Sequence, residues 1–467
     1  MKTINKLLML FALTVLVVMA CEKIADKHLV TRTMDKPSML IADVSIFNGK
    51  DSILLQHQYV MIVQGKILQI SDVPPEISSE TTVIDGTGKT LIPGLIDAHV
   101  HLSGSGAVPW ENISANESYN LESYLYAGIT TVYDLGGMAS DLHKLSEKIN
   151  SGELVGPTIY NTHLPITIKN SHPIPLAKTI LPWPLKGLVN VISPTIDKVS
   201  EAPDVIRKYA KNDIDYVKIS CDQIPSGSPE MSYDQLKALI DEAHKMDKKV
   251  FVHIGSPENA VNAVKAGADI LAHGIWRGKL TPEQADIIAS YQVPIIYTLA
   301  GFYNVDQINQ GKFVPGKWDK LLVDQRVLEP VSGENGTHVH DQEVMSQFFN
   351  DVTQTTPYWQ DNINLLLKRR VPIVVGTDSN LPGTYAGSTY YQELDLLKAY
   401  GLTNFQILTG ATYLNAKLFL DIPDFGNVAE GKKANLLLLN GNPLEDLDVI
   451  KNPEMILLNG AEIKRKY

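Results

Sequence analysis

The sequence predicts the α/β fold class: a (β/α)8 TIM barrel with a small composite β-sandwich domain built from both chain ends. Three observations predict it. Short apolar runs recur from residue 91 onward, helical segments separate them, and alternating β-rich stretches occur at both ends of the chain. A chain of 467 residues with 44% hydrophobic and 20% charged residues has ample apolar material for such a core.

Eight apolar runs carry the expected barrel strands. They show little polar alternation, as parallel strands covered on both faces should. The runs are LIPGLIDAHVHL (91–102), TTVYDLG (130–136), TIYNTHL (158–164), YVKIS (216–220), VFVHI (250–254), ILAHG (270–274), PIIYTL (294–299) and PIVVGTDS (372–379). Strands alternating with helices in series predict a parallel barrel.

Helix-start signals lie between these runs. Ser232 stands three residues before Gln235, and Thr281 stands three residues before Gln284, which is typical of capping boxes. Apolar residues recur at helical spacing within 234–246. These segments therefore predict amphipathic helices between the strands.

The two flanks and one internal segment differ from the barrel pattern. Residues 38–90 and 425–467 alternate apolar and polar positions, so we expect them to form the two parts of the composite domain around a barrel at 91–424. Turn signals at 48–49 and 85–86 support this assignment. The segment 302–357 is a long connection after the seventh strand and is a candidate lid or rim.

The N-terminus predicts export. Residues 7–20 are apolar without interruption, follow two lysines, and are too few to span a bilayer, which is typical of a signal peptide over 1–20. The sequence Val-Met-Ala before Cys21 resembles the lipobox of bacterial lipoproteins. The resemblance implies lipidation of Cys21, a polar tether over 21–37, and a membrane-anchored protein that faces the periplasm or the cell surface. An ordinary secretory signal with a chance cysteine is the alternative.

Composition excludes several classes of protein. Lys and Arg number 41 against 52 Asp and Glu, a net charge of −11, which argues against nucleic-acid binding. Two cysteines exclude a disulfide-stapled scaffold and a thiolate zinc cluster. Any metal site must therefore use His, Asp, Glu or a modified Lys.

Polar residues occur where the predicted strands end. Residues two apart in a strand point to one side, and the active sites of such barrels lie at the carboxyl ends of the strands. A lone histidine, aspartate or lysine there could be a structural group, but six of them at five strand ends predict a metal site. They are His99, His101, Lys218, His253, His273 and Asp378.

These motifs resemble those of a known family. GLIDAHVHL, DYVKIS, VFVHI, ILAHG and VGTDS look like the metal-binding motifs of the amidohydrolase superfamily. GITTVYDLGG and GKKANLLLLNGNPLEDL look like its branch of imidazolonepropionase-like and prolidase-like enzymes. The resemblance covers roughly residues 40–467.

The resemblance implies a ligand set for two divalent metal ions. His99 and His101 would bind the more buried metal with Asp378, and His253 and His273 the more exposed one. Lys218, carbamylated by CO₂, would bridge them. Zinc is the default metal for these ligands, and manganese, iron or cobalt would also fit.

The resemblance also implies a reaction. A metal-bridging hydroxide would attack an amide-type C–N bond of a small-molecule substrate, such as a dipeptide or N-acyl amino acid, with Asp378 as general base and then acid. One alternative is a mononuclear, imidazolonepropionase-like hydrolase of cyclic amides, against which Lys218 argues. The other is a non-catalytic binding lipoprotein, which would be expected to have lost ligands.

Further histidines and a cysteine need separate interpretations. His172, in NSHP, is similar to a loop histidine that meets substrate in related dipeptidases, although Pro173 departs from the usual small neighbour and a surface-loop role stays open. Gly255 follows His253 closely where several relatives carry a tyrosine, which weakens the transfer of dipeptidase activity. The second His-x-His, at 338 and 340, has no apolar strand before it, so we expect no metal role there. Cys221 is expected to be a buried free thiol.

Overall fold

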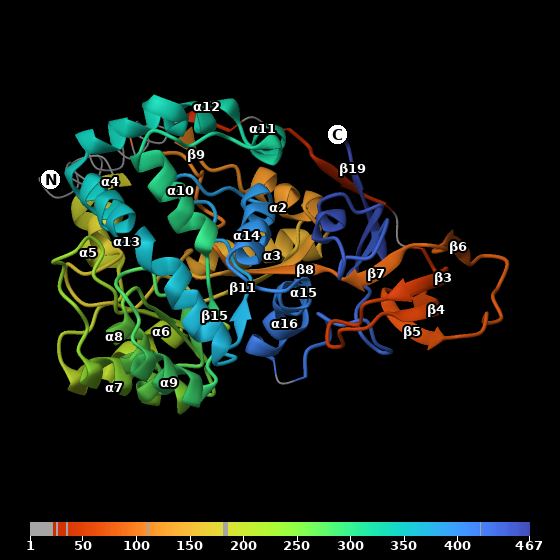
Figure 1. The fold of residues 1–467 in the computed structure, drawn as a ribbon, viewed down its shortest axis with the longest axis horizontal. Coiled ribbons are helices and arrows are strands. Elements are labelled where there is room, and N and C mark those ends of the chain that lie inside the picture. Colours follow the sequence, from red (N-terminus) through yellow and green to blue (C-terminus); the bar gives the residue numbers. More distant parts are fainter. Residues whose placement is uncertain are drawn as a thin grey trace, which may run out of the picture.

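The computed structural model describes residues 22–24, 27–33, 36–108, 110–111, 113–180, 185–420 and 422–467. They form a mixed α/β structure in which a helix-rich body carries a β-rich lobe on one side (Figure 1). The predicted signal peptide and Cys21 lie outside the described residues. In the described part of the chain, no helix is both long and apolar enough to cross a membrane.

The predicted strands form two parallel sheets in the body. One has the order β11-β10-β8, and the other runs from β12 to β16 in chain order. Every neighbouring pair in them is parallel. The strands are β8 (Leu95–Val100), β10 (Ile129–Asp134), β11 (Thr158–Asn161), β12 (Val217–Ser220), β13 (Val250–His253), β14 (Ile270–Ala272), β15 (Ile295–Ile296) and β16 (Ile373–Val374).

Isolated parallel bridges join the edges of these two sheets. Val100 pairs with Ser379, which follows β16, and Ile166, which follows β11, pairs with Ile219 of β12. The Ser220 amide donates to the Ile166 carbonyl at 2.8 Å. Hydrogen bonds therefore connect all eight parallel strands, whose carboxyl ends lie on the same side.

Helices follow most of these strands, and two begin as the sequence predicts. The Ser232 hydroxyl accepts from the Gln235 amide at 3.3 Å, and the Thr281 hydroxyl accepts from the Gln284 amide at 3.2 Å. These caps start α7 and α9 and satisfy amides that have no partner within the helix. The helices of this part are α2 (Glu117–Tyr126), α3 (Ala139–Asn150), α4 (Ile174–Ile180), α5 (Val189–Ile192), α6 (Ala202–Ala210), α7 (Tyr233–His244), α8 (Pro257–Ala266) and α9 (Pro282–Tyr291).

The long connection after the seventh strand is largely helical. It contains α10 (Leu299–Asn309), α11 (Lys317–Leu322), α12 (Gln325–Leu328) and α13 (Glu343–Lys368). α13 is amphipathic and packs against α10 and α4, so these three helices cover one side of the body (Figure 1). The rim of the strand ends is therefore built from ordered helices, and the chain continues through α14 (Ser388–Ala399), α15 (Asn404–Ala411) and α16 (Tyr413–Phe419).

One nine-stranded sheet draws on both ends of the chain. Its order is β2-β19-β18-β17-β7-β3-β4-β5, and β6 pairs with β3. β7 and β17 pair antiparallel, which places strands from the two ends side by side. The strands are β2 (Val30–Arg32), β3 (Ser38–Ile46), β4 (Leu55–Val63), β5 (Lys66–Ser71), β6 (Thr82–Asp85), β7 (Thr90–Pro93), β17 (Leu436–Leu439), β18 (Met455–Leu458) and β19 (Ala461–Arg465).

Part of the segment expected to be a tether is ordered. β2 pairs with β19, and Leu29 and Val30 are buried, so this stretch belongs to the sheet. β1 (Glu22–Lys23) pairs with β9 (Ile113–Ser114). β1 and β2 were not predicted because residues 21–37 have low hydropathy, and a short edge strand contributes only a few apolar residues.

An aromatic cluster fills the interior near the amino ends of the strands, away from their carboxyl ends. Phe419 of α16 stacks on Phe251 of β13 with ring centroids 5.2 Å apart, and Tyr216 meets both rings edge-on. These side chains belong to one buried apolar cluster with Ile96 and Val374. Since the interior is packed there, polar groups of the strands can gather only at the carboxyl ends.

Candidate metal centre

The six predicted ligand residues all lie near the carboxyl ends of parallel strands. Three are strand residues: His99 in β8, Lys218 in β12 and His253 at the end of β13. The other three come after their strands: His101 directly after β8, His273 directly after β14, and Asp378 four residues after the end of β16. Adjacent parallel strands bring these positions together although up to 279 residues separate them along the chain.

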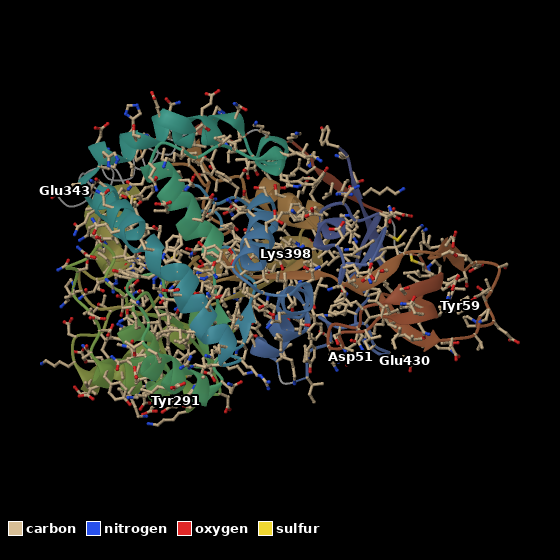
Figure 2. All side chains as sticks on the ribbon, viewed as in Figure 1. Asp51, Tyr59, Tyr291, Glu343, Lys398 and Glu430 are labelled. Atoms are coloured by element: carbon tan, nitrogen blue, oxygen red, sulfur yellow. The ribbon has the colours of Figure 1, made fainter. Side chains whose placement is uncertain are left out.

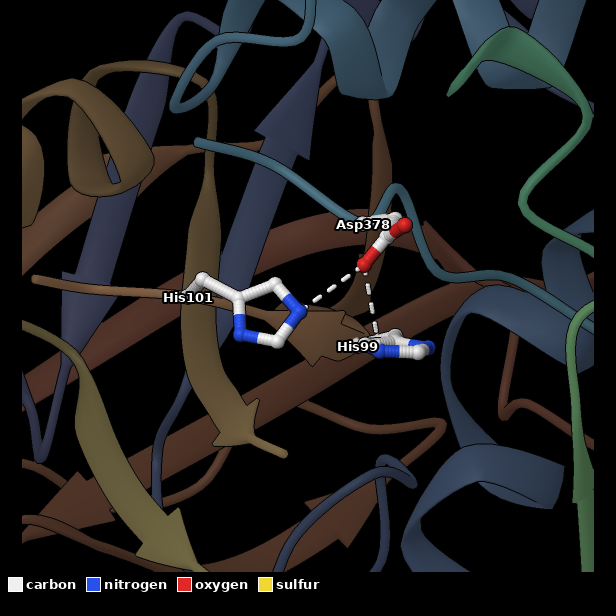
Figure 3. Close-up of side chains that lie close together, drawn as sticks. All are labelled: His99, His101 and Asp378. Carbon is white, nitrogen blue, oxygen red and sulfur yellow. Dashed lines mark hydrogen bonds and ion pairs between the residues drawn. The ribbon is translucent and has the colours of Figure 1, made fainter. Parts of the chain in front are cut away.

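His99, His101 and Asp378 form the tightest group (Figure 3). Asp378 Oδ1 lies 2.9 Å from His101 Nε2 and 3.2 Å from His99 Nε2. One ligand atom from each residue lies within 4.8 Å of the other two. Two imidazole nitrogens and one carboxylate oxygen suit a divalent transition metal, so the group is a candidate metal site.

The other three residues extend this group into one cluster. Lys218 Nζ lies 3.4 Å from His99 Nε2. The ring of His273 lies 4.6 Å from that of His99 and 4.1 Å from that of His253, measured between centroids. Lys218 is only 2% exposed, so its amine faces this cluster and not solvent.

Burial sets the protonation of the cluster. It lowers the pKa of Lys218 to about 7, against the opposing effect of nearby Asp378 and Asp134. Burial, and next the charge of Lys218, holds the pKa values of His99 and His253 well below their usual range. Burial and then His253 do the same for His273. Neutral imidazoles have a free lone pair, which is the form that binds metals.

Thr298 is hydrogen-bonded to one of the histidine rings, and Asp222 lies near another. The Thr298 hydroxyl lies 2.8 Å from His273 Nδ1, and Asp222 Oδ2 lies 3.6 Å from His253 Nε2. The hydrogen bond with Thr298 leaves Nε2 of His273 available as a ligand atom. Sequence reasoning missed both partners, although each is a polar residue at the end of a predicted strand run, which was the available signal.

Asp97 fixes the strand that carries two of the ligands. Its carboxylate accepts from the Thr377 hydroxyl at 2.7 Å, the Thr377 amide at 3.0 Å and the His99 amide at 3.3 Å. Burial raises the pKa of Asp97 to about 7. Through Thr377, this residue ties β8 to the segment that presents Asp378.

Backbone strain coincides with the ligand positions. His273 has φ of 75° and Asp378 has φ of 59°, in the left-handed region that non-glycine residues seldom adopt. Thr298, which contacts His273, has φ of 50°. Such conformations cost free energy and cluster at functional sites, so they support a functional role for this end of the strands.

The structure brings His172 to the cluster as well. Its ring centroid lies 4.5 Å from that of His253, and burial holds its pKa well below the usual range. This environment does not fit the alternative of a solvated surface loop. His172 therefore lies beside a member of the cluster, and its contact with a substrate stays a prediction.

The remaining singled-out residues lie in other environments. Cys221 is a buried free thiol, as expected, and its Sγ donates to the His253 carbonyl at 3.1 Å. His338 and His340 occupy a 3-10 helix, Gly333–Asp341. The His338 side chain is 68% exposed and lies 3.3 Å from Asp341.

A sequence comparison identifies a matching family. The model of the amidohydrolase family matches residues 90–277 and 359–461, more than half of the chain. Among curated proteins, ochratoxinase of Aspergillus niger is 23% identical over 408 residues, covering 78% of this chain and 73% of its own length.

Solved structures share the fold. A prolidase complexed with N-methylphosphonate-L-proline superposes with a TM-score of 0.72 at 20% identity, covering 92% of this chain and 100% of that one. A Xaa-Pro dipeptidase with methionine bound in its active site gives a TM-score of 0.71 at 21% identity, covering 91% of this chain and 99% of that one. At these identities the likeness describes the fold alone.

Proposed function

Because the chain belongs to the amidohydrolase family and is a hydrolase of C–N bonds, we propose that it holds two divalent metal ions and cleaves an amide-type bond. The observation that carries this proposal is the position of Lys218. Its amine lies 3.4 Å from His99 Nε2, inside a buried cluster with four histidines and Asp378. A lysine there is difficult to explain as a structural group, because its charge would be desolvated among metal ligands.

The donor set divides into two halves around Lys218. His99, His101 and Asp378 would hold one ion, and His253 and His273 the other. A carbamate on Lys218 would supply one oxygen to each ion. Carbamylation needs the neutral amine, which the lowered pKa of Lys218 supports. Zinc is the default ion for these ligands.

Two bound ions would supply a nucleophilic water of lowered pKa and a Lewis acid for the carbonyl oxygen. Asp378 would take the proton of the attacking water at its carboxylate and deliver it to the leaving nitrogen. Its side chain is 16% exposed, so the carboxylate is not sealed from solvent. His172, beside His253, would contact the substrate.

The substrate class proposed is a dipeptide or an N-acyl amino acid. The names of the similar proteins, prolidase, Xaa-Pro dipeptidase and ochratoxinase, support an amide of this kind. Two further parts of the proposal rest on the pattern of the chain. The eight parallel strands close into one (β/α)8 barrel, which the hydrogen bonds at both seams support, and the nine-stranded sheet forms a β-sandwich lobe beside it. Lipidation at Cys21 anchors the exported protein to a membrane, as its lipobox-like sequence suggests.

Metal content of the protein purified without chelator tests the proposal. We expect about two ions per chain, and a carbamate carbon signal from Lys218 by NMR after incubation with ¹³C-labelled CO₂. Hydrolysis of a dipeptide and N-acyl amino acid library should disappear in Asp378→Asn. His338→Ala is the matched control, because it removes a histidine outside the cluster.

Three outcomes would contradict the proposal. One ion per chain with hydrolysis of cyclic amides would favour the mononuclear hydrolase. Two ions without hydrolysis, together with ligand binding that survives Asp378→Asn, would favour a binding protein. A folded sample with no metal and an unmodified Lys218 would remove the basis of the binuclear centre.

A further inference from the structure

An apolar cavity lies beside Asp378. It has a volume of about 90 Å³ and is formed by α4, α10, α13 and the loop after β16. Its walls are mostly aromatic and aliphatic, with Phe302 and Val305 from α10 and Met345, Phe348 and Phe349 from α13. Phe302, Val305, Met345 and Phe349 are each less than 9% exposed, so this wall is part of the packed interior.

The lining carries almost no free polar group. Among the described residues that form the cavity, only Asp378 is charged. The lining contains two threonines, whose hydroxyls donate to backbone carbonyls: Thr179 to Leu176 at 2.7 Å, and Thr384 to Asp378 at 3.0 Å. A polar or charged group placed in this cavity would lose its hydration without gaining partners.

The cavity adjoins the metal cluster directly. The ring of Phe302 meets His273 edge-on, with centroids 5.6 Å apart at 83°. Phe302 also stacks on Trp276 at 5.0 Å and 20°, which holds its ring in place. Since Asp378 is both a member of the cluster and a wall of the cavity, a substrate reacting at the cluster has one side against this cavity.

We propose that this cavity binds an uncharged aliphatic group beside the scissile bond, of about the size of a leucine or valine side chain. The inference rests on the proposed function, because it assigns a specificity pocket to that hydrolase. Its size argues against a larger group: an apolar cavity of about 150 Å³ holds benzene, and this one is smaller. Each methylene buried there should raise kcat/KM about fourfold.

Kinetics with a side-chain series tests this assignment. Dipeptides and N-acetyl dipeptides with Gly, Ala, Val, Leu, Phe or Lys on either side of the bond are compared with the metal-loaded enzyme. At one of the two positions, kcat/KM should rise about 100- to 300-fold from Gly to Leu, which adds four carbons, and fall again for Phe and Lys. The position at which it rises identifies the acyl or the amine side.

Gly301→Ala should make the cavity smaller without strain. A Cβ at this position would lie 3.6 Å from Thr384 Cγ2 and 3.9 Å from Asp378 Cβ, which are ordinary contacts. We expect the preference to move from Leu to Val or Ala. Gly187→Ala is the matched control, because an added Cβ there meets nothing within 4 Å.

Phe348→Ala should enlarge the cavity and move the preference toward Phe. Tyr291→Ala is the control, since it removes an exposed aromatic ring of α9 at the opposite edge of the body from the start of α13 at Glu343 (Figure 2). Both variants are compared with the wild type over the whole substrate series, so a general loss of activity is separated from a change in preference.

A readout without turnover completes the test. With ¹³C-methyl methionine, the Met345 signal, identified through Met345→Leu, should shift in a saturable way as isobutanol is added. Glycerol should leave this signal unchanged, and Gly301→Ala should weaken the isobutanol effect.

The outcomes separate this inference from the proposed function. Hydrolysis with no dependence on side-chain size at either position would overturn the pocket and leave the hydrolase intact. A saturable shift of Met345 in a protein that holds no metal and hydrolyses nothing would support the apolar site and contradict the proposed function. A Met345 signal that does not respond to isobutanol would count against the pocket.

Discussion

The chain contains two His-x-His motifs, and the structure places them in different surroundings. His99 and His101 follow one another along and just after β8, and both nitrogens Nε2 meet the same carboxylate oxygen of Asp378. His338 and His340 occupy a 3-10 helix, where residues two apart point in different directions. His338 lies near Asp341, while His340 Nε2 lies 3.3 Å from the Asn309 carbonyl.

The difference shows that a His-x-His spacing brings two imidazoles together only when the secondary structure that carries it turns both side chains to the same side. A strand turns residues two apart to one side, and its parallel neighbours supply the remaining ligands. The 3-10 helix of His338 and His340 neither turns the two side chains to one side nor has parallel strands beside it in the part of the chain that the structure describes. The variants below test this contrast, beginning with the largest expected effect.

Removal of a ligand should have the largest consequence. His101→Ala takes away a nitrogen that lies 2.9 Å from Asp378 Oδ1. We expect kcat/KM to fall by about 1000-fold or more because the ion that activates water is lost. Metal analysis and steady-state kinetics measure the effect. His338→Ala should retain wild-type metal content and rate, and an equal loss in both variants would refute the contrast.

Lys218→Met should have the second-largest effect on activity. Methionine keeps the length of the side chain but offers no amine for carbamylation. Metal content should fall from about two ions per chain to one, with a loss of about 100- to 1000-fold in kcat. Lys398→Met, at an exposed lysine of α14, is the control. Two ions retained in Lys218→Met would show that the lysine does not bridge.

A smaller effect is expected from Thr298→Val. Valine keeps the branched shape but removes the hydroxyl that lies 2.8 Å from His273 Nδ1. Loss of such an orienting partner weakens metal affinity by about 10- to 100-fold. Competition with a chelator measures the affinity, and Thr337→Val provides an exposed control. Unchanged affinity would mean that packing alone orients His273.

Buried and exposed carboxylates should also differ in their effect on stability. Glu393 accepts from the Leu299 and Ala300 amides at 3.0 and 2.6 Å, and burial raises its pKa from 4.5 to about 8. Between these pH values the folded protein keeps a proton that the unfolded chain loses. Its contribution to the free energy of unfolding therefore falls as pH rises through this window, by about 5 kcal/mol at most.

Thermal unfolding of Glu393→Gln from pH 4.5 to 8 measures this contribution. The decline in stability should be smaller in the variant than in the wild type, and Asp97, whose pKa burial raises to about 7, should account for part of what remains. Glu343→Gln, at an exposed position of α13, should keep the wild-type profile (Figure 2). A decline as large in Glu393→Gln as in the wild type would assign the whole pH dependence to other buried groups.

Most strands and helices of the body could be predicted because short apolar runs and capping boxes in the sequence mark them. The apolar runs became β8 and β10 to β16, and the boxes at Ser232 and Thr281 started helices. The strand β2 was not predicted, since its three residues carry no periodic signal and depend on pairing with β19.

The sequence by itself determined which residues could form the metal centre. Six polar side chains stand at the ends of apolar runs, and parallel strands in series must end on one side. Because of this rule, the positions of the six residues along the chain are enough to predict that they lie close together.

Only the tertiary structure decided what surrounds the centre. The contacts of Thr298 and Asp222 with two histidines, and the cavity between α4, α10, α13 and the loop after β16, join segments far apart in the chain. No periodicity encodes such contacts, because they depend on how packed helices meet at the rim. The strand ends therefore indicate the reaction type, whereas the proposed preference for an aliphatic substrate group depends on helix packing.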